Sequence, residues 1–262
     1  MTSKIAHLGN RALISVRGPD ARSFLNNLLT QDVSHLTPGT VRFAGLLSPP
    51  GRLLFDLFVI GETDGVTLDV DVQQRDALIQ RMSMYRLRAQ VEIVADQRPV
   101  LVSWPDVAEG FVADPRTPLL GGRAYGNAPA VTATAADWET HRLGVGVPDP
   151  THDTGQDKTY PIDANFDLLN GIDFAKGCFV GQETTSRMKR RGDIKKRMLP
   201  ITFEGPLPLR GAEVLNGDLR VGEVLTGQTG VAMALVRLDR LEGELTVDGR
   251  PVAVRWPVWM PR

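Results

Sequence analysis

KGCFVGQE, residues 176–183, is the most informative segment of this 262-residue chain, and it contains the only cysteine. Gly177 and Gly181 stand on either side of Cys178, where they let the backbone bend tightly and let a ligand approach the main chain. Lys176 favours a thiolate by its charge, and a helix that begins near Gly181 adds the positive end of its dipole. A free cysteine is usually a small buried hydrophobe. These neighbours favour a functional thiol instead, so Cys178 is the candidate catalytic residue.

Polar and basic residues flank this segment. Asp163 and Asn165 precede it, in positions where polar residues usually cap a helix. A basic run follows, made of Arg187, Lys189, Arg190, Arg191, Lys195, Lys196 and Arg197. Such a run is most often a solvated face. Its arginines also suit carboxylates, because the guanidinium fork matches a carboxylate in shape and charge.

The composition is that of an ordinary globular protein, with 42% hydrophobic and 23% charged residues. The formal net charge of -1 gives no whole-molecule field for nucleic acid or membrane, so any basic surface is local. One cysteine excludes an intramolecular disulfide and a zinc site with several thiolates. The histidines are scattered, so no metal site is expected. No signal-peptide core follows Met1 and no apolar run reaches the roughly 20 residues that span a bilayer, so we expect a cytoplasmic protein.

The first part of the chain predicts a mixture of helices and strands. Apolar residues over 21–29 recur at helical spacing, which predicts a helix with Asp20 as its N-cap. Over 67–72, apolar residues alternate with Asp69 and Asp71, which predicts a half-buried strand. A further helix is expected at 73–89, with strands at 53–60, 91–94 and 100–104. Strands interleaved with helices favour an α+β unit.

The last part of the chain is β-rich. Asn216-Gly217 and Asp248-Gly249 are dipeptides typical of hairpins. Regular strands without a long helix predict a small antiparallel barrel or sandwich after a break near Pro200. Four tryptophans are expected in core or barrel packing rather than at a ligand: Trp104, Trp138, Trp256 and Trp259.

KGCFVGQE resembles the signature K-G-C-[FY]-x-G-Q-E of the YgfZ family, folate-binding proteins of iron–sulfur cluster assembly and repair that include mitochondrial homologues. Weaker similarities follow in the family's order: F-L-x-x-x-x-T-x-D at 24–32, a turn at 47–52, the approach at 161–167 and the S-R … R-G continuation at 186–192. The signature is specific, whereas each of the others is weak alone. The resemblance spans nearly the whole chain.

That family is similar in fold to the T-protein of the glycine cleavage system, an aminomethyltransferase that uses tetrahydrofolate. The resemblance therefore implies an α+β, three-domain aminomethyltransferase-like fold with a central funnel, a ferredoxin-like insertion and a C-terminal antiparallel β-barrel. We place a discontinuous folate-binding domain at 1–45 and 135–195. The ferredoxin-like domain is placed at 46–134 and the β-barrel domain at 196–262.

The resemblance also implies a cofactor, tetrahydrofolate or a reduced one-carbon derivative, in a funnel lined by the Cys178 segment. The residues expected at this cofactor are Lys176, Gly177, Gly181, Gln182, Glu183, Arg187, Asp163 and Asn165. Gln182 and Glu183 either cap a helix or contact the pterin. Arg187 is the first candidate for binding the glutamate tail.

By the same resemblance, the protein supports assembly or repair of iron–sulfur proteins, especially 4Fe-4S enzymes, together with A-type cluster carriers. The expected partners are these carriers, their client enzymes and reduced folate, with no nucleic acid and no membrane, and a monomer is expected. The role of the thiol stays open between redox chemistry, ligation of a cluster shared with a partner, and capture of a one-carbon unit.

Three other functions stay open. A tetrahydrofolate-dependent aminomethyltransferase would need a catalytic aspartate, and the strand-like alternation of Asp56, Asp69 and Asp71 gives it no clear position. A folate-independent scaffold for a cluster carrier is the second. A nucleic-acid-binding module is the third, opposed by the near-neutral charge and by the lack of aromatic residues over 187–197.

Overall fold

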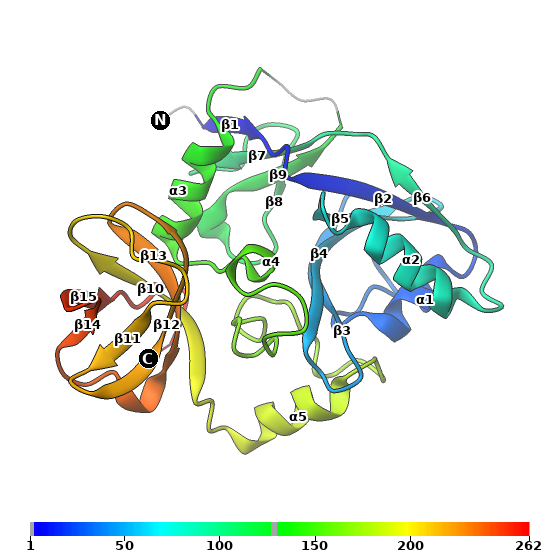
Figure 1. Ribbon diagram of the computed structural model, residues 1–262. Helices are drawn as coiled ribbons and strands as arrows, with labels where there is room; N and C mark the ends of the chain where they lie inside the picture. The colour runs from blue at the N-terminus through cyan, green and yellow to red at the C-terminus, as the bar shows by residue number, and fades with distance from the viewer. Residues whose placement is uncertain (1–2, 127–129, 262) are drawn as a thin grey trace.

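The computed structural model describes residues 3–126 and 130–261, which form two sheets, a closed barrel and several helices (Figure 1). The strands are β1 (Lys4–His7), β2 (Arg11–Arg17), β3 (Val41–Leu47), β4 (Leu53–Glu62), β5 (Gly65–Asp71), β6 (Glu92–Asp96), β7 (Val100–Trp104), β8 (Val112–Ala113), β9 (Gly122–Tyr125), β10 (Lys196–Phe203), β11 (Glu213–Asn216), β12 (Leu219–Gln228), β13 (Val231–Arg237), β14 (Leu245–Val247) and β15 (Arg250–Val254). The helices are α1 (Ala21–Leu28), α2 (Arg75–Arg86), η1 (Pro118–Leu120), α3 (Ala135–Val145), α4 (Pro150–Asp153), α5 (Gln182–Arg191) and η2 (Leu238–Arg240).

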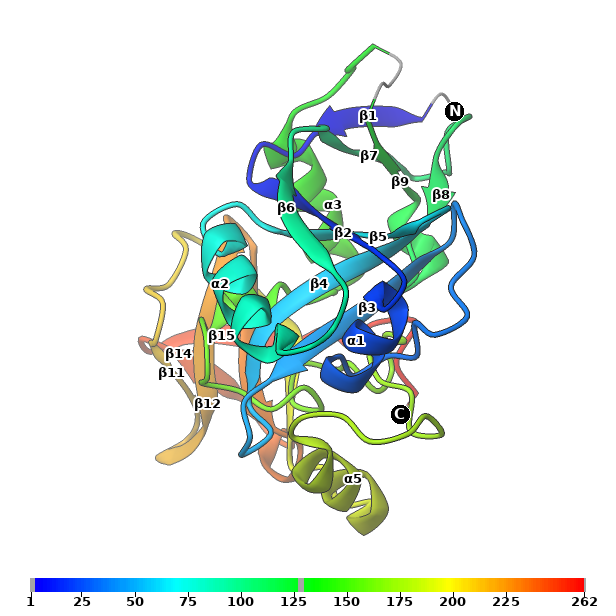
Figure 2. The same cartoon turned by 90° about the vertical axis from the view of Figure 1, so that its right-hand side faces the viewer.

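A five-stranded antiparallel sheet in the order β3-β4-β5-β2-β6 is the largest open sheet. Its strands β2, β4, β5 and β6, with α1 and α2, follow the ferredoxin-like order β-α-β-β-α-β, and β3 extends one edge. Figure 2 shows α1 and α2 on the same face of this sheet. The helices thus cover one face and leave the other free for contacts with the rest of the molecule.

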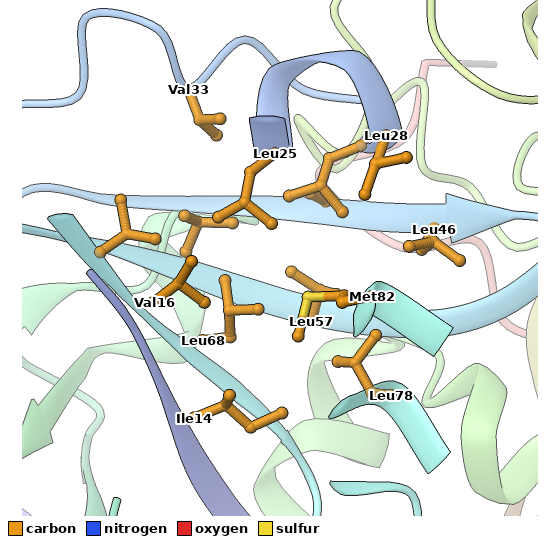
Figure 3. Close-up of a cluster of buried hydrophobic side chains, with 14 of the residues drawn as sticks. Ile14, Val16, Leu25, Leu28, Val33, Leu46, Leu57, Leu68, Leu78 and Met82 are labelled. Atoms are coloured by element: carbon orange, nitrogen blue, oxygen red, sulfur yellow. The ribbon is translucent and has the colours of Figure 1, made fainter. Parts of the chain in front are cut away.

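The core beneath these helices forms because their apolar residues fall on one side. Leu25 and Leu28 of α1 point toward the sheet, as do Leu78 and Met82 of α2 (Figure 3). They pack against sheet residues such as Leu57, which is fully buried. The predicted helix over 21–29 is confirmed, with its end at Leu28.

Asp20 is the N-cap residue of α1, as predicted, but its side chain does not cap the helix. Its side chain makes no hydrogen bond to the first turn of α1. Its Oδ2 accepts a hydrogen bond from the backbone N–H of Gln90 at 2.7 Å instead. The carboxylate therefore joins the start of α1 to the chain that follows α2, and no local pattern contains that contact.

A second, four-stranded sheet in the order β1-β7-β9-β8 packs against α3. Trp138 of α3 meets Trp104 of β7 edge-on, with 5.6 Å between ring centroids. Both tryptophans are buried, as the sequence predicts. Helix α3 begins with a capping box in which Thr134 and Asp137 satisfy each other's backbone N–H groups.

The C-terminal strands close into a barrel in the order β10-β13-β12-β11-β14-β15, which confirms the predicted barrel. Pairing of β10 with β15, where Ile201 faces Val254, leaves the sheet without a free edge. Asp248 and Gly249 join β14 to β15 with φ of +50° and +73°, the positive values that a tight hairpin turn requires.

Helix α4 and the turn-rich chain up to α5 lie between the sheets and the barrel (Figure 1). Asp153 of α4 accepts hydrogen bonds from Thr226 of the barrel. The backbone N–H of Asp157 donates to Leu53 O of β4 at 2.9 Å. This segment therefore contacts both the five-stranded sheet and the barrel, and it connects the two.

The predicted domain limits stay a prediction. The ferredoxin-like set of strands begins at Arg11, so it includes β2 and α1, which the predicted division assigns to the discontinuous domain. Separately, none of the helices within 3–126 and 130–261 is long and apolar enough to cross a membrane.

Shortening a buried side chain of α2 tests the packing of the helices. Met82 is fully buried, so Met82→Ala should lower the free energy of unfolding by about 2–5 kcal/mol through lost burial and a cavity. Met84→Ala is the matched control, because Met84 is 60% exposed on the same helix and should change stability by no more than about 0.5 kcal/mol. Urea denaturation measures both, and equal effects would contradict this arrangement of α2.

Candidate functional site

Lys176 anchors the KGCFVGQE segment to the end of α1. Its ammonium donates to three backbone carbonyls, Asn26 O at 2.6 Å, Leu29 O at 2.7 Å and Gln31 O at 3.0 Å. Asn26 lies in the last turn of α1, where carbonyls have no partner within the helix, and Leu29 and Gln31 follow the helix. Burial lowers the pKa of Lys176 to about 8, against the raising effect of nearby carboxylates. All three donors of the ammonium are thus used within the protein.

Gly181 anchors the other end of the segment, against the turn at 48–51. Its φ is +79°, and a Cβ at this position would lie 2.7 Å from Ser48 O and 2.9 Å from Gly51 Cα. Gly51 is equally constrained, since its own Cβ would lie 2.9 Å from Thr184 Cβ. Only glycines allow this contact, which seats the start of α5 on the turn before β4.

Cys178 is exposed between these two anchors. Gly177 faces open space, and the next residue, Phe179, is buried in the core. The segment therefore fixes its backbone through Lys176, Phe179 and Gly181 while it presents the thiol to solvent.

The remaining predicted residues of this segment lie at the start and on the surface of α5. Gln182 is half-buried at the first position of the helix, and no side-chain cap bond forms there. Glu183 and Arg187 are exposed. Their predicted contacts with folate stay a prediction.

Asp163 and Asn165 lie beside β10, where both contact the backbone of Met198. Asn165 is buried and donates from Nδ2 to Met198 O at 2.7 Å, so it fixes the chain beside β10. Asp163 borders a hollow beneath α5, where burial raises its pKa to about 6 against nearby cations such as Lys196. The two residues thus differ, since only Asp163 faces a space that a ligand can enter.

A separate cavity of about 480 Å³ lies where the two sheets, α3, α4 and the barrel meet. We call it the central cavity. Its lining includes Arg11, Asp56, Phe58, Arg116, Arg123, Trp138, Glu139, Arg142, Asp149, His152 and Thr226. None of the nine predicted site residues is part of this lining, because the contacts of Lys176 and Gly181 hold the thiol segment elsewhere.

Buried ion pairs build the wall of the central cavity. Asp69 accepts from Arg11 Nε at 2.7 Å and from Arg123 Nη2 at 2.5 Å. Arg116 binds Asp114 through two hydrogen bonds, and the guanidinium of Arg123 lies 3.8 Å from the ring centroid of Phe58. The strand β5 is therefore buried on both faces, and the prediction of a half-buried strand is wrong.

Two carboxylates of the cavity differ in acidity. Burial and the charge of Asp149 raise the pKa of Asp56. The pKa of Asp149 is lowered despite burial, because His152 donates a hydrogen bond to it and Arg142 adds a positive charge. The hydrogen bond to Asp149 in turn raises the pKa of His152 to about 9. Groups whose acidities are pushed apart in one cleft are typical of functional sites.

No sequence pattern predicted this cavity. Asp56 and Asp69 looked like ordinary members of alternating strands, and the arginines are scattered over more than a hundred positions. One signal was present, since acidic residues in otherwise apolar strands need buried partners. Within the described residues, no group of three or more His, Cys, Asp or Glu side chains could hold a metal ion.

The architecture is similar to the crystal structure of glycine cleavage system aminomethyltransferase T from Bartonella henselae, with a TM-score of 0.79 over 98% of this chain and 86% of that one. At 17% identity this likeness shows the fold alone. A family model described as CAF17, C-terminal beta-barrel domain, matches residues 195–262. The molecule therefore has an aminomethyltransferase-like fold with a C-terminal antiparallel β-barrel, as the resemblance implies.

Sequence comparison narrows this class. The chain is 31% identical to human "Iron-sulfur cluster assembly factor IBA57, mitochondrial", over 97% of this chain and 84% of that protein. The mouse protein of the same name gives 31% with the same coverage, and a homologue from Coccidioides immitis gives 34% over 77% of this chain and 58% of that protein. The chain belongs to the IBA57 proteins of the YgfZ family of iron–sulfur cluster assembly factors.

These relatives correct the expected location. The human, mouse and Coccidioides proteins are all named mitochondrial, which points to mitochondria rather than the cytoplasm, so the cytoplasmic expectation is wrong. An organelle address is a separate signal read by import receptors. Net charge and hydropathy of a folded chain therefore carry no information about it.

Removing the Lys176 side chain should release the thiol segment. Lys176→Ala leaves three carbonyls without their donor and should lower the free energy of unfolding by about 1–3 kcal/mol. It should also speed hydrogen exchange over 176–181. Lys158→Ala, at an exposed lysine, is the control. Unchanged exchange in Lys176→Ala, measured by mass spectrometry, would show that the anchor is unimportant.

His152 should make stability depend on pH. Its pKa rises from 6.5 to about 9 on folding, so its contribution is fully present below pH 6.5 and is lost as the pH rises toward 9. His152→Gln should therefore show a smaller fall in Tm over this window than the wild type. Thermal unfolding in a pH series measures the difference, with His35→Gln at an exposed histidine as the control. An identical fall in His152→Gln would contradict the pairing with Asp149.

Proposed function

We propose that this protein supports the assembly or repair of iron–sulfur proteins, with Cys178 as the residue that acts on the cluster or on its carrier. The observation that carries the proposal is the exposed thiol held between two rigid anchors, Lys176 and Gly181. Its expected partners are A-type carriers and 4Fe-4S client enzymes. Membership of a family whose members are named cluster assembly factors supports this assignment.

The anchored segment suits transfer to a partner more than a closed catalytic site. An exposed thiolate can ligate a cluster whose other ligands belong to a second protein, whereas one thiol alone cannot hold a cluster. Fixing the backbone in advance removes part of the ordering cost of that encounter. Cys178 therefore acts together with a partner chain.

Reduced folate is the small molecule that we assign to the central cavity. The cavity volume of about 480 Å³ lies within the roughly 300–1,000 Å³ typical of ligand pockets. Trp138 and Phe58 give it aromatic walls, and Asp56 offers an acceptor for the N–H groups of a pterin. The arginines of the lining favour the carboxylates of the glutamate tail. The residues present thus fit the group.

When bound, a reduced folate supplies a one-carbon unit or reducing equivalents. The protein's own contribution is to orient the ligand and to hold protons beside it. Asp56, whose pKa is raised by burial, retains a proton more readily than an ordinary aspartate. Asp149, with its lowered pKa, stays ionised beside protonated His152. One acid and one base on the same wall suit proton transfer to and from a bound ligand.

Calorimetric titration with tetrahydrofolate tests the two halves of this proposal. The wild type should bind saturably, and Asp56→Asn should bind about two- to tenfold more weakly, because the amide offers one acceptor oxygen fewer and a net hydrogen bond contributes roughly 0.5–1.5 kcal/mol. Cys178→Ala should bind like the wild type and yet fail to restore 4Fe-4S enzyme activity in cells that lack the homologous factor.

The control for this titration is Asp76→Asn, at an exposed carboxylate of α2. If no reduced folate binds the wild type, the folate part of the proposal fails and a folate-independent scaffold becomes the better function. If Cys178→Ala restores enzyme activity in full, the assignment of the thiol fails instead.

A further inference from the structure

A hollow of about 680 Å³ lies beneath the second half of α5, apart from the central cavity, and we call it the α5 hollow. Met188, Ile194 and Tyr160 contribute apolar surface to its lining. Met188 and Ile194 are only partly buried against the core, so part of each side chain remains available. The hollow therefore offers room for an apolar side chain from outside.

Cations surround this hollow in excess over carboxylates. Residues 187–197 contain seven lysines and arginines and a single aspartate, although the whole chain has a net charge of -1. Arg191 and Lys196 line the hollow and are exposed. Within the described residues, neither has a carboxylate within the 4.0 Å of a salt bridge. Lys189 and Arg197 pair with Asp167, and Lys195 pairs with Asp193, so the fold neutralises part of this run. The charges of Arg191 and Lys196 remain available to a ligand in the hollow.

Asp163 stands at the edge of the hollow as an acceptor without a donor. Its side chain is half-buried, and among the described residues no group donates a hydrogen bond to its carboxylate. Its backbone carbonyl, by contrast, accepts from Met198 N at 2.8 Å. The carboxylate is partly withdrawn from water and faces the hollow, so a ligand that brings an N–H group gains a hydrogen bond here.

We propose that the α5 hollow docks an acidic segment of a protein partner that carries one large apolar side chain. The apolar side chain packs on Met188 and Ile194, the flanking carboxylates pair with Arg191 and Lys196, and a backbone N–H donates to Asp163. This inference rests on the proposed function, since it names the chemistry by which a cluster-carrying partner is held beside Cys178.

The geometry of α5 connects the hollow to the thiol. A helix of ten residues is about 15 Å long, and an extended chain covers about 3.3 Å per residue. A docked segment therefore spans from the hollow to the Cys178 end of α5 in about five residues. Nucleic acid suits this surface less well, because residues 187–197 contain no aromatic ring on which a base could stack.

The test uses a synthetic acidic peptide with one phenylalanine and, five residues away, a cysteine activated as its pyridyl disulfide. The Cys178 thiolate attacks this disulfide, a mixed disulfide forms and pyridine-2-thione leaves, which is followed by absorbance. This rate is divided by the rate at which Cys178 reacts with 2,2′-dithiodipyridine, a small neutral disulfide. The ratio therefore does not depend on the intrinsic reactivity of the thiol. Docking should raise this ratio by about tenfold over a peptide with amides in place of the carboxylates.

Charge reversal locates the docking surface. Arg191→Glu/Lys196→Glu should abolish the acceleration, and the milder Arg191→Gln/Lys196→Gln should remove much of it if the reversed form is unstable. Arg86→Glu/Arg88→Glu is the matched control, because it reverses two exposed cations at the end of α2 and should keep the acceleration. The Met188→Ser variant should lose most of the acceleration. A peptide with glycine in place of phenylalanine should lose most of it with the wild-type protein.

Equal losses in the α5 and α2 double variants would overturn the proposal, since only bulk charge would then matter. The proposal would also be overturned if a uridine oligonucleotide slowed the reaction of Cys178 with 2,2′-dithiodipyridine more than the acidic peptide without its activated disulfide does. Folate titration of the same variants separates this inference from the proposed function. If the variants lose the acceleration by the acidic peptide but still bind folate, the α5 hollow is supported as the docking site. If the acidic peptide never reacts faster than the peptide with amides, the docking proposal is refuted, even if the folate and thiol assignments hold.

Discussion

The buried ion pairs of Asp69 hold the architecture together. This carboxylate of β5 binds Arg11 of β2 on one side and Arg123 of β9 on the other, so it joins the five-stranded sheet to the four-stranded sheet. Asp69 is fully buried and Arg123 nearly so. A buried pair of this kind adds little net stability, but loss of one partner costs about 3–5 kcal/mol because a charge is left unpaired. The relative position of the sheets, and with it the shape of the central cavity, depends on this carboxylate.

The thiol and the cavity are positioned by different physical means. Charged side chains shape the central cavity, where low dielectric strengthens each interaction and pushes the acidities of Asp56 and Asp149 apart. The Cys178 segment is instead fixed by contacts with the main chain, through the ammonium of Lys176 and the close approach of Gly181 to the 48–51 turn. The first arrangement suits a small ligand that is enclosed, and the second suits a surface that meets another protein.

Local patterns predicted much of the fold. Helical spacing predicted α1, the Asp248-Gly249 dipeptide predicted a hairpin, and regular strands predicted the barrel, because each of these depends on neighbours within a few residues. The same approach failed for β5, where alternation of acidic and apolar residues predicted a half-buried strand. Its acidic face meets arginines from distant parts of the chain rather than water.

The sequence by itself determined the family, the helix and hairpin positions and the presence of a distinctive cysteine segment, since these are properties of contiguous residues. Only the tertiary structure decided what Lys176 does, because its partners Asn26, Leu29 and Gln31 lie about 150 positions away in the chain. It also decided that Asp56 of β4 and the arginines of β2 and β9 converge on one cavity, with Asp69 of β5 paired to those arginines. Electrostatic partners across such separations are chosen by the way the sheets pack, and no local pattern records that choice.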